Sequence, residues 1–482
     1  MRKEYYLKNI KEAVVAIKNS IGSDGCLCVP FQKKQVKIAN SRWQEGALTL
    51  AWAQERLKQD LALEIEKALL FWNGLQNPDG SFPEQDRKSY AATAFSSLAV
   101  AKALKLCEKR ISSKVFEECV EALANAKGFL EENSNQGKTN QEIAAVSALE
   151  EMREFVKVDG KAVERKKTLA FENQTPSGFF KEDEGVDLGY ASLSWEMLEL
   201  LGFRKDAEKF VETLAHFVFP DGTICANFSR TIGWVVLDQL EMLAAKNPLA
   251  ERILNLYIQA DLKGLHSARH FLDLRHTMTD AYRLCSALDN CKGERKPKAE
   301  MPFERLDWSR EFPERILVVR KPRHMSVFYL QKKFAYSCWF KKGMVANLSS
   351  NLEGSTVIEK HFVTESPEML EFEKRENSLR AWGICRPNVS KAGFPENALA
   401  KASAAFLKKK FEKSFEFFPG RIQICVKASN GVEKVPVIGN LKVKGFKFRK
   451  LEQKPNTVFY NRKDFGVWEK EFKQKLDYSL SG

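Results

Sequence analysis

The stretch PDGSFPEQDRKSYAATAFSSLAVAKAL, residues 78–104, joins a short Gly turn to an apolar helical segment. Pro-Asp-Gly is typical of a tight turn in which the glycine adopts a backbone conformation that other residues avoid. The segment after it is rich in Ala, Leu and Ser, and its apolar residues cover most of a helix circumference. Such a helix is expected to be buried on nearly every side. The stretch therefore predicts a turn that leads into an inner helix of a helical domain.

The same arrangement recurs along the first 290 residues, at intervals of about 40 to 57 residues. The Gly turns are SDGCL from residue 23, PDGSF from 78, NQGKT from 135, PSGFF from 176, PDGTI from 220 and LKGLH from 262. A charged amphipathic segment precedes each turn and a more apolar segment follows it, both with helical spacing. Six such units predict about twelve helices, with the apolar ones inside. We expect an (α/α)6 toroid, with an open superhelix of helix pairs as the alternative.

The chain changes character after residue 290. Residues 291–312 are charged, contain Pro297 and Pro302, and predict a linker. Later segments such as RILVVR, MSVFYLQ and RIQICVKA alternate in the way of β-strands. The predicted domains are an α/α toroid over residues 1–290, a linker over 291–312 and a mostly antiparallel β-sandwich over 313–482. Within the last domain, residues 396–415 suggest a helical insert.

Composition limits the class of protein. The 482 residues are 44% hydrophobic, which is enough for a core in more than one domain. The N-terminus is amphipathic, unlike a signal peptide, and no run of about 18 apolar residues predicts a membrane span. The ten cysteines are scattered, so we expect reduced thiols and a cytoplasmic location. No Walker motif, dinucleotide-binding glycine motif, GxSxG or HExxH is present, and we expect no cofactor.

The positive charge is concentrated near the end of the chain. The formal net charge is +14, and residues 401–482 hold 19 Lys and Arg against 8 Asp and Glu. A segment of this kind binds phosphates or an acidic polymer at low salt, or forms the solvated face of Lys-rich strands. No signature of a nucleic-acid-binding module is present, so nucleic acid is not an expected partner. The pattern predicts no particular oligomeric state.

In a ring of helical hairpins, the Gly turns that enter the inner helices all lie at one end, which we call the rim. Side chains that are distant in sequence therefore meet there. The fourth turn is the most polar, because SGFFKEDEGVDLGY (177–190) carries Asp183, Glu184, Asp187 and Tyr190 in front of an inner helix. Carboxylates also favour helix N-termini through capping and the helix dipole. These acids thus predict either a functional site or an ordinary helix start.

Polar residues also stand at three other turns. They are Asp221, Asn227 and Arg230 in the fifth unit, Asn140, Gln141 and Glu142 in the third, and His276, Asp280, Tyr282 and Arg283 in the sixth. The guanidinium of Arg230 suits a carboxylate. His266 and His270 have a spacing found in metal ligands, but no third ligand at a clear spacing completes the set, so we expect no metal site.

Six helical hairpins followed by a β-rich half resemble the heparinase II/III-like group of α/α-toroid polysaccharide lyases, over nearly the whole chain. SGFFKEDEGVDLGY resembles the run that bears that family's catalytic Tyr, which gives Tyr190 this role. NQEIAAVSALEEM resembles the family's Asn-His run, which neutralises the substrate carboxylate. Asn140 fits that run, whereas Gln141 stands where the family has His. FPDGTICANFSRT (219–231) resembles a second Gly turn with a following Arg.

The resemblance implies β-elimination on a polysaccharide, with a Tyr that takes the proton next to a uronate carboxylate. A Tyr with a pKa of about 10 needs nearby cations to act as a base at neutral pH. The expected catalytic residues are Tyr190, Arg230, Asn140, His276 and Asp187. The expected substrate-binding residues are Gln141, Glu142, Glu182, Asp183, Glu184, Asp221, Asn227, Asp280, Tyr282 and Arg283.

Three alternatives stay open. The carboxylates around Tyr190 would raise its pKa and repel an acidic sugar. They suit a glycosidase that acts on a neutral glycan with an acid and a base among Glu182, Asp183, Glu184 and Asp187. The other two are a non-catalytic glycan-binding or scaffold protein, and a terpenoid cyclase or prenyltransferase-like toroid. The last lacks a DxDD or DDxxD motif and leaves the β-rich half unexplained.

Overall fold

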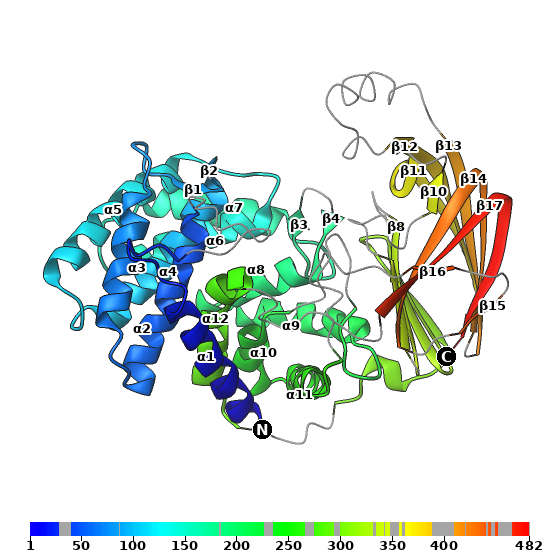
Figure 1. Cartoon of the computed structure of the whole chain (residues 1–482), viewed down its shortest axis with the longest axis horizontal. Helices are drawn as coiled ribbons and strands as arrows, with labels where there is room; N and C mark the ends of the chain where they lie inside the picture. The colour runs from blue at the N-terminus through cyan, green and yellow to red at the C-terminus, as the bar shows by residue number, and fades with distance from the viewer. Residues whose placement is uncertain are drawn as a thin grey trace.

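The computed structural model describes residues 1–27, 40–85, 87–182, 185–225, 235–265, 274–293, 299–330, 334–341, 343–347, 356–358, 362–387, 409–419, 421–439, 442–444, 449–451 and 465–481. In these residues, twelve α-helices precede residue 291 and a large antiparallel sheet follows them (Figure 1). The prediction of about twelve helices followed by strands is therefore confirmed.

Outer and inner helices alternate along the chain. The outer helices are α1 (Arg2–Lys18), α3 (Ala62–Gly74), α5 (Ser113–Glu132), α7 (Gly160–Glu172), α9 (Arg204–Leu214) and α11 (Pro248–Leu262). The inner helices are α2 (Gly46–Leu57), α4 (Tyr90–Cys107), α6 (Thr139–Met152), α8 (Leu188–Leu200), α10 (Leu237–Ala244) and α12 (Leu274–Asn290). Short 3-10 helices are η1 (Ser41–Glu45), η2 (Ala215–Phe217) and η3 (Pro302–Glu304).

Burial distinguishes the two classes of helix. In α5, Val115, Cys119, Ala122 and Ala126 are buried at spacings of three and four residues, so only one face meets the core. In α8, all residues from 188 to 199 except Tyr190 are buried. The inner helices contact one another in the order α2, α4, α6, α8, α10 and α12, and α12 contacts α2 in turn. The contacts between inner helices therefore form a closed cycle.

Four of the Gly turns pack directly against the next outer helix. Gly80 has a φ of 84°, and a Cβ at this position would lie 2.2 Å from the backbone oxygen of Asn125 in α5. Gly25, Gly178 and Gly222 have φ values of 86°, 83° and 87°, and their added Cβ atoms would likewise approach the backbone of α3, α9 and α11. Glycine tolerates both the positive φ and the contact. Each of these four turns thus packs against the outer helix of the following helical unit.

Two short hairpins belong to the turns, namely β1 (Phe82–Glu84) with β2 (Arg87–Ser89), and β3 (Lys181–Glu182) with β4 (Gly185–Val186). The main sheet has the order β10-β11-β12-β13-β14-β9-β8-β7-β6-β5; β17 also pairs with β14, and β15 and β16 pair with β17. Its strands are β5 (Trp308–Phe312), β6 (Ile316–Lys321), β7 (His324–Leu330), β8 (Phe334–Phe340), β9 (Gly343–Asn347), β10 (Thr356–Ile358), β11 (Phe362–Arg375), β12 (Ser378–Pro387), β13 (Lys409–Phe418), β14 (Arg421–Gly439), β15 (Lys442–Lys444), β16 (Arg449–Leu451) and β17 (Phe465–Ser481).

The sequence suggested a helix over residues 396–415, and this prediction is wrong for residues 409–415, which belong to β13. Lys413, Phe415 and Phe417 are buried and Glu416 is exposed, which is the two-residue alternation of a strand. Residues 396–408 lie outside the described part of the chain.

The main sheet folds back on itself. β7 and β13 are four steps apart in the strand order, which would separate them by about 19 Å in a flat sheet. The rings of Phe328 in β7 and Phe415 in β13 nevertheless have centroids 4.9 Å apart. These two strands therefore face each other across an apolar layer.

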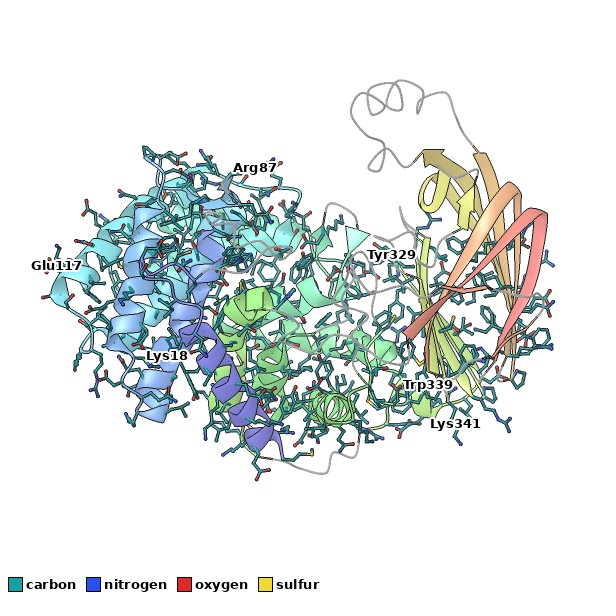
Figure 2. The ribbon with its side chains drawn as sticks, in the orientation of Figure 1. Lys18, Arg87, Glu117, Tyr329, Trp339 and Lys341 are labelled. Carbon is teal, nitrogen blue, oxygen red and sulfur yellow. The ribbon has the colours of Figure 1, made fainter. Side chains whose placement is uncertain are left out.

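The helical part and the sheet share a bonded interface. The Tyr329 hydroxyl of β7, which lies between the two parts in Figure 2, accepts a hydrogen bond of 3.1 Å from the backbone N–H of Val186. The Glu314 carboxylate accepts one of 3.3 Å from the N–H of Ser177. Phe217 and Phe312 add a ring contact with centroids 5.3 Å apart. The sheet thus borders the fourth Gly turn, at residues 176–180 and the β3–β4 hairpin after it.

Two findings bear on the expected cellular environment. No helix within the described ranges is both long enough and apolar enough to cross a membrane. Cys26 is disulfide-bonded, so the prediction that all thiols are reduced is wrong at this position. Six other described cysteines are buried: Cys107, Cys119, Cys225, Cys285, Cys291 and Cys338.

A fully buried histidine lies between the facing strands. His324 of β7 has its ring 5.7 Å from that of Phe340 and 6.4 Å from that of Phe417, measured between centroids. Neither of its ring nitrogens has a hydrogen-bond partner among the described residues. Burial, together with the charges of Arg320 and Lys321, lowers the pKa of His324 to about 4. The imidazole is therefore neutral near pH 7.

We predict that His324→Leu weakens the loss of stability in acid. An unfolded histidine titrates at about 6.5, so between about pH 6.5 and 4 the unfolded chain binds more protons and stability falls as pH falls. His324 accounts for at most about 3 kcal/mol of that loss. The free energy of unfolding in urea, measured at pH 7 and pH 4.5 for both proteins, gives the loss in acid. His216 is present in both proteins and therefore contributes equally to their acid losses. Equal acid losses in the two proteins would contradict the assignment.

Candidate functional site

Asp187 and Tyr190 lie at the start of α8. Asp187 is the N-cap residue, and its carboxylate accepts a hydrogen bond of 2.8 Å from the backbone N–H of Tyr190. This arrangement is the helix start that the sequence offered as one interpretation. Tyr190 is half-buried while its neighbours in α8 are buried. It is thus the residue of this helix start that retains exposed surface.

Asn140, the predicted carboxylate ligand, already binds a carboxylate of the protein. Glu182 accepts a 3.0 Å hydrogen bond from the backbone N–H of Asn140 and a 2.8 Å bond from its side-chain amide. The contact joins the start of α6 to the β3–β4 hairpin, 42 residues later in the chain. The next two acids of this hairpin, Asp183 and Glu184, lie outside the described residues.

Glu142 belongs to a buried network rather than to the exposed rim. Its carboxylate lies 3.2 Å from the Lys166 ammonium and accepts a 3.0 Å bond from the Tyr90 hydroxyl. Burial and the charge of Glu142 raise the pKa of Tyr90, whereas burial lowers that of Lys166. The network fastens α7 to the starts of α4 and α6. Gln141 is half-buried and its side-chain oxygen accepts a 2.8 Å bond from Asn135.

The sixth unit brings three predicted residues together. Arg283 is buried, donates a 2.7 Å bond to Asp280, and has its guanidinium 4.5 Å from the centroid of the Tyr282 ring. It also donates a 3.3 Å bond to Glu196 of α8. Because α10 lies between α8 and α12 in the cycle of contacts, this bond joins two inner helices that are not consecutive in that cycle.

Two further buried carboxyls join this cluster, and the sequence analysis did not single them out. Asp238 of α10 is fully buried, and burial followed by the charge of Glu196 raises its pKa well above the usual range. Glu45, at the end of η1, is also fully buried, and burial raises its pKa to about 7 despite its ion pair with Arg42. Acids within apolar inner segments, as in LSWEMLEL and VVLDQLEML, are the signal that could have revealed such residues.

The remaining predicted residues are placed as follows. The Asp221 carboxylate accepts bonds of 3.0 Å and 2.6 Å from the N–H and hydroxyl of Thr223, so it shapes its own turn. His276 is half-buried in α12. Asn227, Arg230, His266 and His270 lie outside the described residues, so the predicted approach of Arg230 to Tyr190 stays a prediction. Within the described ranges, no group of three His, Cys, Asp or Glu side chains is arranged to hold a metal ion.

Solved structures share this arrangement of elements. A chondroitin AC lyase from Streptomyces coelicolor A3, in complex with chondroitin sulphate, is similar with a TM-score of 0.58 and 10% identity, over 99% of this chain and 79% of that chain. A Paenibacillus xanthan lyase is similar with a TM-score of 0.52 and 9% identity, over 99% and 57%. Both are α/α-toroid polysaccharide lyases. At these identities the likeness shows the fold alone.

A type II terpene cyclase from Scytonema also matches, with a TM-score of 0.40 and 14% identity over 60% of this chain. This score is too low to support the cyclase alternative. No protein-family model matches the chain. No curated protein matches it either.

We predict that Arg283→Met lowers the free energy of unfolding by about 3 to 5 kcal/mol, because it leaves the buried Glu196 carboxylate without its cation. The midpoint and slope of urea unfolding measure this loss. Arg305→Met is the matched control, since Arg305 pairs with Glu300 at the surface and its loss should change little. Equal effects of the two substitutions would show that the Arg283 pair is not a buried interior contact.

Proposed function

We propose that this protein acts on a polysaccharide or glycan and that it resembles the heparinase II/III-like lyases in architecture. The likeness to a chondroitin AC lyase over 99% of the chain carries the proposal. The proposed layout is an (α/α)6 toroid over residues 1–290, a linker over 291–312 and a β-sandwich over 313–482, with β5 joining the sheet from within the linker. The closed cycle of inner helices and the facing strands β7 and β13 support this layout.

The proposed reaction is β-elimination with Tyr190 as the base. Tyr190 stands at the N-terminus of an inner helix, keeps exposed surface, and borders the hairpin that contacts the sheet. Its phenolate would take the proton next to a uronate carboxylate. The electron pair left on that carbon then forms the double bond while the bond to the glycosidic oxygen breaks, and the phenol returns the proton to that oxygen. Arg230 is the cation proposed to favour the phenolate and the enolate-like charge, with His276 as a second contributor.

A non-catalytic glycan-binding role is the second candidate, and the Asn140–Glu182 contact favours it. Both donors of Asn140 that face Glu182 are occupied by that carboxylate. The rim thus offers fewer free donors to a uronate than the resemblance implies. A glycosidase acting on a neutral glycan fits the same acidic surroundings. A cytoplasmic location stays a prediction from the sequence.

We predict that the protein produces unsaturated products from at least one uronate-containing polysaccharide and that Tyr190→Phe lowers the rate by about 10²- to 10⁴-fold, the usual contribution of a general base. Ultraviolet absorbance of the new double bond measures the reaction. Tyr5→Phe is the control, because the Tyr5 hydroxyl binds Asp261 in the outer helices. A flat trace for the unmodified protein on every polymer would exclude the lyase and favour binding or hydrolysis.

A further inference from the structure

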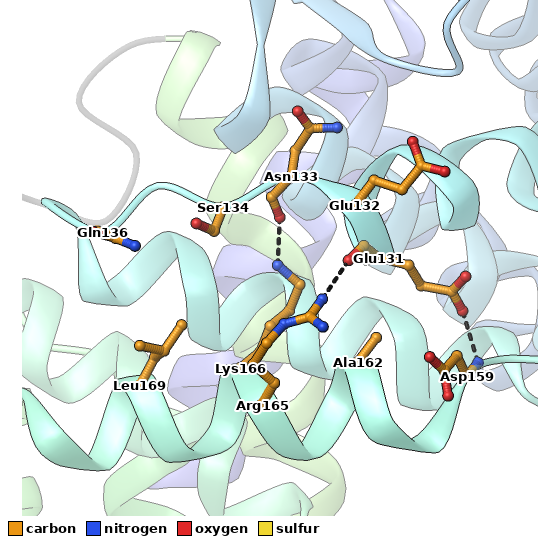
Figure 3. Close-up of a pocket in the computed structure, with 10 residues that line it drawn as sticks. All are labelled: Glu131, Glu132, Asn133, Ser134, Gln136, Asp159, Ala162, Arg165, Lys166 and Leu169. Atoms are coloured by element: carbon orange, nitrogen blue, oxygen red, sulfur yellow. Dashed lines mark hydrogen bonds between the residues drawn. The ribbon is translucent and has the colours of Figure 1, made fainter.

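A pocket of about 620 Å³ lies between the end of α5, the turn after it and one face of α7 (Figure 3). This volume falls within the range of about 300 to 1,000 Å³ that is usual for ligand sites. Its lining residues are Glu131, Glu132, Asn133, Ser134, Gln136, Asp159, Ala162, Arg165, Lys166 and Leu169. The turn that forms one wall continues into α6, which begins at Thr139 and carries Asn140. The pocket therefore adjoins the rim without being part of the predicted catalytic set.

The wall formed by residues 131–133 is fixed to α7 by hydrogen bonds to its backbone and side chains. Arg165 donates a 2.7 Å bond to the backbone oxygen of Glu131, and Lys166 donates one of 2.6 Å to that of Asn133. The Glu131 carboxylate accepts a 2.7 Å bond from the N–H of Asp159, as Figure 3 also shows. These bonds preform the pocket, which reduces the ordering cost of binding.

Three side chains at the end of α5 and in the turn after it are available to a ligand. Glu132, Ser134 and Gln136 line the pocket, and none of them has a hydrogen-bond or ion-pair partner in the part of the chain that the structure describes. Together they present a carboxylate acceptor, a hydroxyl and an amide. Ala162 and Leu169 on α7 add apolar surface. Hydroxyl-rich rings with apolar faces, as in sugars, match this combination.

The charges of the pocket disfavour an acidic ligand. The Lys166 ammonium is matched by buried Glu142, and Glu131 lies 3.5 Å from Lys127. The remaining charged groups of the lining are two carboxylates, those of Glu132 and Asp159, and one guanidinium, that of Arg165. The surplus is negative, so a uronate or sulphate group would be repelled.

We propose that this pocket binds an uncharged sugar residue of the glycan that the rim engages. The proposal rests on the proposed glycan function and adds a second site to it, outside the catalytic residues. Glu132 and Gln136 bind sugar hydroxyls, and Leu169 packs against the ring.

The test uses the full chain and calorimetric titration with neutral xylo-, cello-, manno- and chito-oligosaccharides of about six units, beside uronate oligosaccharides of the same length. A double variant, Glu132→Ala with Gln136→Ala, should bind the neutral ligand at least about ten-fold more weakly, since it loses a bond to a charged acceptor. Glu117→Ala is the matched control, because Glu117 is an exposed carboxylate near the other end of α5 (Figure 2).

Each outcome decides the proposal. Weaker binding in the double variant alone supports it. Unchanged binding in the double variant, no binding of any neutral ligand by the unmodified protein, or tighter binding of the uronate ligand through this pocket would overturn it. The elimination assay on uronate polymers tests the proposed function separately. A negative result for the pocket therefore does not change the outcome of that assay.

Discussion

The close approach of four Gly turns to the next outer helix is the constraint on which the helical part of the structure depends. At Gly25, Gly80 and Gly222, an added Cβ would overlap a backbone oxygen of the helix in front, and the same residues have a positive φ. At these turns, one unit is fixed to the next by backbone contact rather than by side chains that could repack. The turns that carry these contacts also start the inner helices. The same backbone contacts therefore place these turns and the inner helices that follow them.

The interior of that ring holds charge, which stability alone does not explain. Arg283 and Glu196 form a buried pair between α12 and α8, and apolar residues of the same volume are often as stable as such a pair. Burial, which penalises the charged carboxylate, raises the pKa of Asp238 beside them well above its usual range. The cluster extends to Asp280 and Glu45 near the rim. Among these residues, Asp280 is the one that keeps exposed surface, so it is where the cluster reaches solvent.

Local patterns made the helices and turns predictable, whereas the contacts of the site depend on distant segments. The recurrence of turns like the one at Gly80, with apolar segments after them, was enough to predict twelve helices. The link between Asn140 and Glu182 joins two turns 42 residues apart, and no spacing within either turn encodes it. Glu45 is a single acid before an apolar helix, and only its burial distinguishes it. The Ala-rich sequence before β13 favoured the prediction of a helix, although Lys and Phe alternate within β13 itself.

Under the proposed function, the Asn140–Glu182 contact limits how a glycan carboxylate can bind at the rim. A uronate that is to use the Asn140 amide must displace Glu182, and the two carboxylates then compete for one donor pair with similar bond strengths. Exchange of one carboxylate for another supplies little net binding free energy, and the released Glu182 charge would repel the incoming one. Affinity for a glycan must therefore come from uncharged parts of the chain or from cations elsewhere at the rim. The pocket beside α7 is proposed to bind such an uncharged sugar, and binding there would not depend on displacing Glu182.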